Sequence, residues 1–209
     1  MPDNTPAATA ARELAEEQCW RAGAWGLLAR LLAAAPDAQL LDELRALQID
    51  TGTQQGPFVT AWEALARSAR EAQASRLEAD YQRIFIGLTE GEVQPYGSWY
   101  LTGFMMERPL VELRQALAGL GITRQQDNRE PEDHAAALCE SMRLLILDTE
   151  VDSEQSLQRQ SAFYGRFIQT WLPRMLADLA VIEGSAFYTA VAGFGQALLG
   201  VEAAYLGPF

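Results

Sequence analysis

The short stretch EPEDH, residues 130–134, gathers residue types that can do acid–base or metal chemistry. It holds the only histidine of the 209-residue chain, His134, beside the carboxylates of Glu130, Glu132 and Asp133. A zinc site usually draws on several Cys or His ligands, and a di-iron bundle needs the Glu-x-x-His pattern twice. One histidine meets neither requirement, so we expect no metal site here.

Other sequence signatures of catalysis are missing as well. The chain contains no GxxxxGK[ST] phosphate loop, no GxGxxG nucleotide fingerprint and no GxSxG nucleophile elbow. A Ser–His–Asp triad needs a particular serine, and nothing in the sequence singles one out. The sequence therefore predicts a protein with no catalytic residues and no resident cofactor.

EPEDH also has the pattern of a helix start. Proline is favoured at the first helical position, and the residue before a proline is pushed out of the α region. We therefore expect Glu130 to be the cap and Pro131 the first residue of a helix over 131–148. Glu132 and Asp133 would lie in the first turn, where carboxylates interact favourably with the helix dipole. The stretch is then either an ordinary helix start or an acidic edge that attracts a basic peptide.

A second unusual stretch is PYGSWY, residues 95–100, with three aromatic residues and a proline in six positions. We expect it to be a loop. Its rings would either pack on the core or offer an aromatic surface to an apolar peptide segment. Trp20, Trp25 and Trp62 fall on predicted helices and are expected in the core.

The elements that position these stretches are predicted to be helices. Apolar residues recur at helical spacing and strand patterns are nearly absent, so we expect an all-α bundle of about nine to eleven helices. The polar segment 122–130 is the expected hinge between subdomains 1–121 and 131–209, unless the two form one continuous unit. The expected helices cover 12–34, 37–48, 57–71, 75–88, 105–118, 131–148, 154–171, 173–183 and 187–205.

Composition limits the classes of partner. The chain is 49% hydrophobic with a formal net charge of −12, which argues against nucleic acid and favours cationic partners. Cys19 and Cys139 have no metal-ligand spacing and are expected to be buried, reduced thiols. We find no run of about 18 apolar residues and no signal-peptide pattern, so we expect a cytoplasmic protein without a membrane span.

Three blocks together resemble a known family. They are EADYQRIFIG (78–87) followed by PYGSWY, then EPEDH, then FIQTWLP (167–173) followed by Phe187 and Tyr188. In order and spacing the first two resemble the TorD/DmsD family of molybdoenzyme maturation chaperones, also called redox enzyme maturation proteins. The third departs from the family pattern, because Thr170 or Trp171 stands where many members have histidine and Arg174 where they have tryptophan. The resemblance therefore gives only weak support for any functional role of the closing helices.

The resemblance implies a cytoplasmic chaperone with a TorD-like, all-α helical bundle that is not an enzyme. Members bind the twin-arginine leader of a molybdopterin oxidoreductase catalytic subunit, hold the apo form until its cofactor is inserted, and so proofread before Tat export. Acidic residues would attract the arginines, aromatic rings would pack on the apolar segment, and the histidine would tie the hinge to the groove through a hydrogen bond. The peptide-binding residues implied are Glu78, Tyr81, Tyr96, Ser98, Trp99, Tyr100, Glu130, Glu132, Asp133 and His134.

Several alternatives stay open at the level of sequence. The chain could serve a non-exported nitrate reductase-like subunit, or be a general helical adaptor in which both stretches serve only packing. The resemblance also leaves room for transient contact with the molybdopterin cofactor, and for weak guanine-nucleotide binding with hydrolysis. A hinge at 122–130 allows either a monomer or a domain-swapped dimer. The client enzyme is not named by the sequence.

Overall fold

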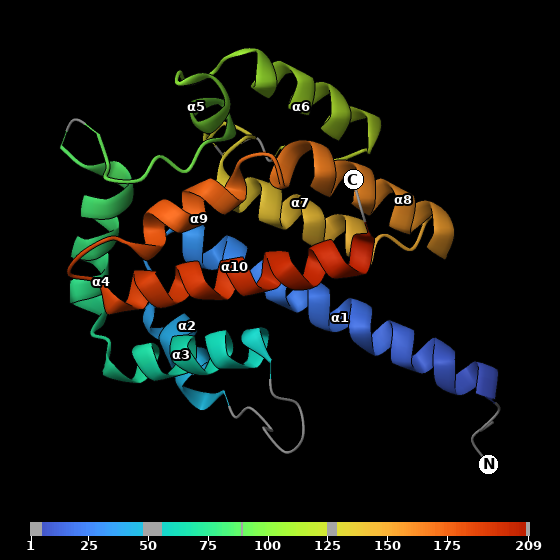
Figure 1. Ribbon diagram of the computed structural model, residues 1–209, viewed down its shortest axis with the longest axis horizontal. Coiled ribbons are helices and arrows are strands. Elements are labelled where there is room, and N and C mark those ends of the chain that lie inside the picture. The colour runs from blue at the N-terminus through green and yellow to red at the C-terminus, as the bar shows by residue number, and fades with distance from the viewer. Residues whose placement is uncertain (1–5, 48–55, 89, 125–128, 208–209) are drawn as a thin grey trace.

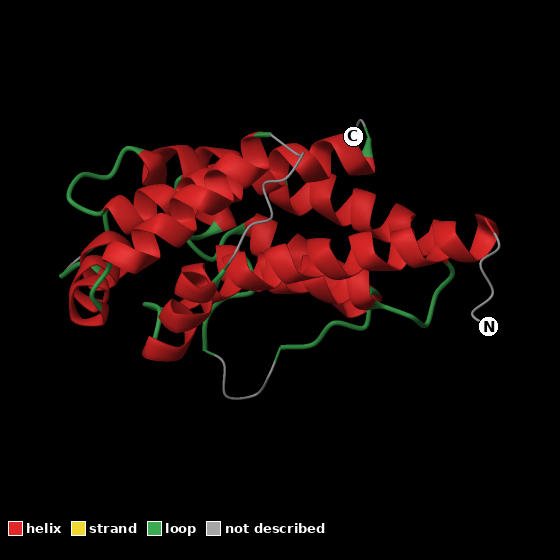
Figure 2. Ribbon diagram, turned by 90° about the horizontal axis from the view of Figure 1, so that it is seen from below, coloured by secondary structure: helices red, strands yellow, loops and turns green. Residues whose placement is uncertain are grey.

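The computed structural model describes residues 6–47, 56–88, 90–124 and 129–207. Within these ranges the chain forms ten α-helices and two single-turn π-helices and no strand, which confirms the all-α prediction (Figure 2). No helix in the same ranges is long and apolar enough to cross a bilayer. The elements are α1 (Pro6–Ala33), α2 (Ala38–Ala46), α3 (Pro57–Glu71), α4 (Ala74–Tyr81), η1 (Gln82–Ile86), α5 (Gly97–Thr102), α6 (Arg108–Gly119), α7 (Ala135–Leu147), α8 (Ser153–Phe163), η2 (Tyr164–Ile168), α9 (Leu172–Ala180) and α10 (Ala186–Leu206).

The core lies where four long helices meet. Figure 1 shows α10 crossing the middle of the molecule between α9 and α3, while α1 packs along α7. Helices α1 and α3 precede the predicted hinge and α7 and α10 follow it, so both predicted subdomains contribute to one hydrophobic core. The division at 122–130 stays a prediction, and residues 125–128 within it lie outside the described residues.

The prediction for the start of the helix after the hinge is wrong by four residues. Helix α7 begins at Ala135 with His134 as its N-cap, so Glu130 is not the cap and Pro131 is not helical. Instead, the His134 N–H donates to the Pro131 carbonyl at 3.1 Å, which closes a turn. The backbone at His134 is extended and pairs with Tyr96 in an isolated antiparallel bridge, and this pairing delays the helix.

The loop predicted at PYGSWY is also only partly correct. Helix α5 begins at Gly97, so the loop ends at Tyr96. The helix expected over 105–118 in fact spans Arg108–Gly119. Residues between the two helices form a link that the sequence pattern assigned partly to helix.

Exposure at the N-terminal end of α1 differs from the prediction. Trp20 is 41% exposed and Cys19 is exposed, whereas Trp25 and Cys139 are fully buried as expected. The difference arises because Cys19 and Trp20 lie on a side of α1 that other helices cover incompletely, although Gln18 and Arg21 beside them bond to α10. The first turns of α1 extend past the other helices (Figure 1). Trp20 still makes an edge-to-face contact with Phe58, with ring centroids 4.8 Å apart.

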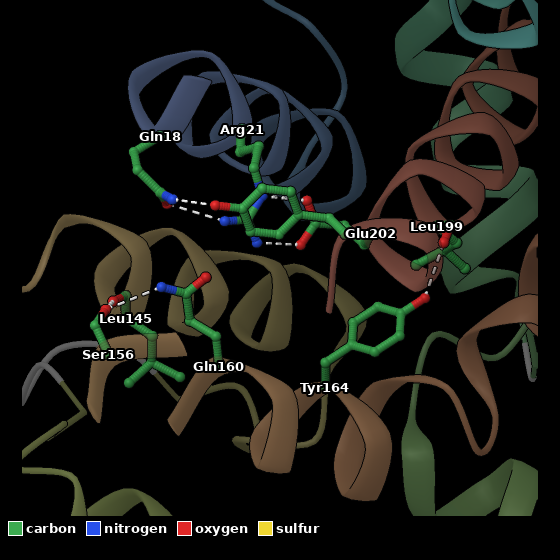
Figure 3. A network of polar contacts seen from close by, with 9 residues as sticks. Gln18, Arg21, Leu145, Ser156, Gln160, Tyr164, Leu199 and Glu202 are labelled. Atoms are coloured by element: carbon green, nitrogen blue, oxygen red, sulfur yellow. Dashed lines mark hydrogen bonds and ion pairs between the residues drawn. The ribbon is translucent and has the colours of Figure 1, made fainter. Parts of the chain in front are cut away.

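A buried ion pair joins the first and last helices (Figure 3). Arg21 of α1 donates from Nε and Nη2 to the two carboxylate oxygens of Glu202 in α10, at 2.7 and 2.6 Å, and neither side chain is exposed. Gln18 accepts a further bond from Arg21, and the Tyr205 ring lies 3.9 Å from the guanidinium carbon. Two parallel bonds on a planar guanidinium fix orientation as well as distance, so the pair sets how α10 lies on α1.

Candidate peptide-binding site

The two unusual stretches of the sequence lie side by side in the structure. Tyr96 and His134 pair as a β-bridge, and the Gly97 N–H donates to the Asp133 carbonyl at 2.9 Å. PYGSWY and EPEDH, although far apart along the chain, therefore form one structural unit. Eight of the ten implied site residues lie in this unit. Five of them make contacts between the two stretches: Tyr96, Ser98, Glu130, Asp133 and His134.

Asp133 caps helix α5 from the other stretch. Its Oδ2 accepts the Ser98 N–H at 2.8 Å, while Tyr96, the N-cap of α5, makes no side-chain capping bond. A carboxylate is favourable at a helix N-terminus because the unpaired N–H groups there carry partial positive charge. Asp133 is only 3% exposed, and its Oδ1 has no partner among the described residues. The carboxylate thus holds α5 and keeps one oxygen available.

His134 caps the other helix of the unit. Its Nδ1 accepts the Ala136 N–H at 3.1 Å, and its ring meets Tyr96 edge to face with centroids 5.1 Å apart. Burial lowers the pKa of His134 below its ordinary value, and the carboxylates of Glu130 and Asp133 oppose this less strongly. A neutral ring suits the acceptor role of Nδ1. The link to PYGSWY is therefore made by the backbone bridge, and the imidazole bonds to its own helix.

Replacing Asp133 with alanine is expected to lower the free energy of unfolding by about 1–3 kcal/mol, because the buried Ser98 N–H loses its acceptor. Urea denaturation measures the loss, and hydrogen exchange at the Ser98 amide localises it to α5. The matched control is Asp152→Ala, since Asp152 caps α8 through the Gln155 N–H. Unchanged exchange at Ser98 in the Asp133 variant would contradict the cap assignment.

Two exposed carboxylates, Glu130 within this unit and Glu78 on α4, are called the acidic edge below. The Tyr96 hydroxyl donates to Glu130 Oε2 at 2.8 Å and so positions an exposed carboxylate. Glu78 of α4 is also exposed. Burial raises the pKa of Tyr81 to about 12, and the charges of Glu130 and Glu78 both add to the rise. The charges of both carboxylates therefore act on the same buried phenol.

Two of the implied residues are engaged elsewhere. The Tyr81 hydroxyl donates to the carbonyls of Leu32 and Ala33 at 3.3 and 2.9 Å, which ties α4 to the end of α1. Glu132 pairs with Arg114 at 2.8 Å and more distantly with Arg124 at 3.9 Å. Tyr81 therefore supports the site from inside, and the charge of Glu132 is largely compensated.

Trp99 and Tyr100 of α5 have different surroundings. Tyr100 stacks on Trp171, with centroids 5.8 Å apart, and its hydroxyl donates to Asp178 at 2.7 Å, so its position is fixed. Trp99 is 36% exposed and has no ring contact of this kind within the described chain. Trp99 is thus the ring of PYGSWY that is most available to a partner.

An exposed apolar link follows Trp99, and sequence reasoning missed it. Its members are large apolar side chains that face solvent, Phe104, Met105 and Met106 between α5 and α6, and Leu101 at the end of α5 continues them. The available signal was the run LTGFMM, in which a glycine interrupts any helical pattern that could bury the residues. Gly103 ends α5 in the left-handed region at a φ of 80°, and Met106 adopts a φ of 60°. The link extends the apolar surface that begins at Trp99.

Side chains that could bind a metal ion do not cluster within the described ranges. These ranges contain no group of three or more His, Cys, Asp or Glu residues placed to hold a metal ion. The unit formed by α5 and residues 130–134 instead combines exposed carboxylates with exposed apolar side chains. Such a surface can bind a segment that is both basic and apolar.

The family model for the nitrate reductase delta subunit matches residues 53–177, which is more than half of the chain. The chain belongs to this family. The TorD/DmsD resemblance is therefore confirmed. The chaperone protein TorD of Vibrio atlanticus is 27% identical over 144 residues, covering 66% of this chain and 67% of the relative. TorD of Ferrimonas balearica is 30% identical over 130 residues, covering 52% of this chain and 60% of the relative.

A solved structure has the same fold. It is described as a candidate redox enzyme maturation protein from Archaeoglobus fulgidus, and it superposes with a TM-score of 0.58 over 84% of this chain and 91% of that one. The two sequences are 15% identical, so this likeness supports the all-α architecture alone. Family membership makes this chain a chaperone of redox enzyme maturation, and an enzyme subunit is its expected partner.

Proposed function

We propose that this chain binds the leader peptide of a molybdopterin oxidoreductase catalytic subunit in the cytoplasm. It holds the apo subunit while the cofactor is inserted and so delays Tat export. The leader would lie along α5 and the turn at residues 130–134. The observation that carries the proposal is the pairing of exposed carboxylates, Glu78 and Glu130, with the exposed ring of Trp99. A twin-arginine leader has the complementary pattern, with a basic part followed by an apolar part.

The state of Asp133 supports the same proposal. Buried carboxylate oxygens are normally hydrogen-bonded, and a buried charge without a partner costs free energy. The Oδ1 of Asp133 is buried and lacks a protein donor among the described residues. A guanidinium of the leader that displaced the edge slightly would supply that donor. Asp133 then acts at short range, after Glu78 and Glu130 have attracted the arginines over a longer distance.

Reversing the charge of Glu130 tests the acidic edge. Glu130→Lys is expected to weaken binding of a synthetic twin-arginine leader at low salt, and the deficit should shrink as salt screens the charges. Fluorescence anisotropy of a labelled leader, repeated across a salt series, measures both effects. The matched control is Glu150→Lys, because Glu150 is an exposed carboxylate outside the proposed surface. Equal losses in the two variants would show that only net charge matters.

One observation favours a second candidate, a chaperone for a non-exported subunit. The matching family model is that of the nitrate reductase delta subunit. Retrieval of the tagged protein from its host during anaerobic respiration, with mass spectrometry of its partners, separates the two. A molybdopterin oxidoreductase with an uncleaved twin-arginine leader supports export proofreading, and one without such a leader supports the second candidate. Absence of either, in cells shown to make such an enzyme, contradicts both.

A further inference from the structure

A cavity of about 560 Å³ lies away from the residues of the candidate peptide-binding site. It is bounded by the end of α3, by α4 and by the link between α9 and α10, and Figure 1 shows the start of α10 beside α4. Its lining includes Arg76 and Ser185 together with two carboxylates, Glu71 and Asp80. A volume of this size is typical of small-molecule sites.

Ser185 is a buried polar side chain without a partner in this cavity. It is 4% exposed, and its Oγ has no hydrogen bond among the described residues. It is the N-cap residue of the 21-residue helix α10 but makes no capping bond. Hydroxyls at this position usually accept an N–H of the first turn, so an N-cap serine without that bond is unusual. A ligand that accepts a hydrogen bond from Oγ would give this buried hydroxyl the partner that it lacks.

The first turn of α10 is open as well. The first backbone bond into this helix is donated by Thr189 to Ser185. Within the described residues, no acceptor is recorded for the N–H groups of Ala186, Phe187 and Tyr188. Unpaired amides and the helix dipole together make such a terminus favourable for an anion.

Arg76 supplies a positive charge at the same end of the cavity. Its Nη2 donates one long hydrogen bond, of 3.3 Å, to the Gly184 carbonyl. No carboxylate of the described residues lies within ion-pair distance of its guanidinium. Arg76, Ser185, Ala186 and Phe187 all line this cavity and can supply donors to an anion within it.

We propose that this cavity binds the phosphate group of a small phosphate ester that also carries hydroxyls. The phosphate oxygens accept from Arg76, from Ser185 and from the first turn of α10. The carboxylates of Glu71 and Asp80 line the same cavity. They repel a second anionic group but accept hydrogen bonds from hydroxyls, and so they select an ester that carries a single phosphate.

Titration with two probes tests the proposal on the full chain. Inorganic phosphate and ribose 5-phosphate are compared at constant ionic strength with chloride as the reference anion, and amide NMR shifts are followed. We expect saturable shifts at Ala186, Phe187 and Tyr188 with both probes, and tighter binding of the ester. Shifts that never saturate, or that spread over the surface and spare these amides, would overturn the site.

Substitutions test separately the residues that would bind the phosphate and the carboxylate that would bind the hydroxyls of the ester. Arg76→Gln and Ser185→Ala are expected to weaken phosphate binding, the first by about tenfold or more because a charge-assisted bond is lost. The matched control is Arg67→Gln, because Arg67 is exposed on α3 and does not line the cavity. Asp80→Asn should make the affinity for ribose 5-phosphate equal to the affinity for inorganic phosphate. The affinity for inorganic phosphate itself should stay the same or rise. Melting without ligand verifies that each variant is folded.

Two outcomes would reject the proposal in different ways. Equal weakening in the Arg76 and Arg67 variants would mean general attraction of anions, with no site. If inorganic phosphate and ribose 5-phosphate bound with equal affinity, and Asp80→Asn changed neither affinity, the proposed selection of an ester would be wrong. Leader binding is not involved in any of these measurements, so their failure leaves the proposed chaperone surface untouched.

Discussion

Glu202→Gln is expected to lower the free energy of unfolding by about 3–5 kcal/mol. The Arg21 guanidinium opposite has no exposed surface and donates to both oxygens of the carboxylate. Glutamine keeps the shape but removes the compensating charge, which leaves a buried cation. Desolvation of an unpaired charge is among the largest single penalties in a protein interior. Urea denaturation monitored by circular dichroism measures the loss.

Two further variants separate the charge effect from lost packing. The double variant Arg21→Met with Glu202→Leu removes both charges and is expected to recover most or all of the stability, since burying a pair costs desolvation on both sides. The control is Glu43→Gln, which breaks the exposed pair with Arg30 and should cost far less because water screens it. A loss in Glu202→Gln no greater than in this control would refute the argument.

The fold could be predicted well because its signals are local. Helical spacing of apolar residues marked most helices, and residues such as Trp25 and Cys139 were placed in the core correctly. Periodicity gives the face of a helix but not where that helix lacks neighbours. The exposure of Trp20 and Cys19 therefore could not be predicted, because it depends on which side of α1 the neighbouring helices leave uncovered.

The roles within EPEDH could not be read from the sequence because they depend on contacts between distant segments. The pattern of a proline followed by carboxylates suggested capping within one helix. In the structure the two residues cap different helices, because Asp133 caps α5 and His134 caps α7. The first bond spans 35 positions. The resemblance identified the right stretch, while propensity alone misplaced the helix start, because the bridge to Tyr96 overrode it.

The candidate site shows the same limit. Ten residues were implied, and the structure separates those that face solvent, such as Glu130 and Trp99, from supports such as Tyr81, whose hydroxyl bonds to the end of α1. A sequence motif does not distinguish contact residues from their supports, because both are needed for the surface. Exposure makes the distinction, and it directs charge reversal to Glu130 instead of the buried Asp133.

Trp99→Ala is expected to weaken leader binding by about 2 kcal/mol, or roughly 30-fold, if the ring anchors the apolar segment of the leader. Calorimetric titration with a synthetic leader measures the change. Stability should fall little, because 36% of the residue is already exposed and the core loses correspondingly few contacts. The pattern sought is thus a large loss of affinity with a small loss of stability.

The matched control is Trp20→Ala, because Trp20 has similar exposure, 41%, but lies on α1. It should leave leader affinity unchanged. If Trp99→Ala kept full affinity while Phe104→Ala lost it, the apolar segment would bind on the link between α5 and α6 and not on α5. If neither variant lost affinity, apolar contact on this face would be excluded. The acidic edge would then have to hold the leader through its basic part alone, and binding would be strongly dependent on salt.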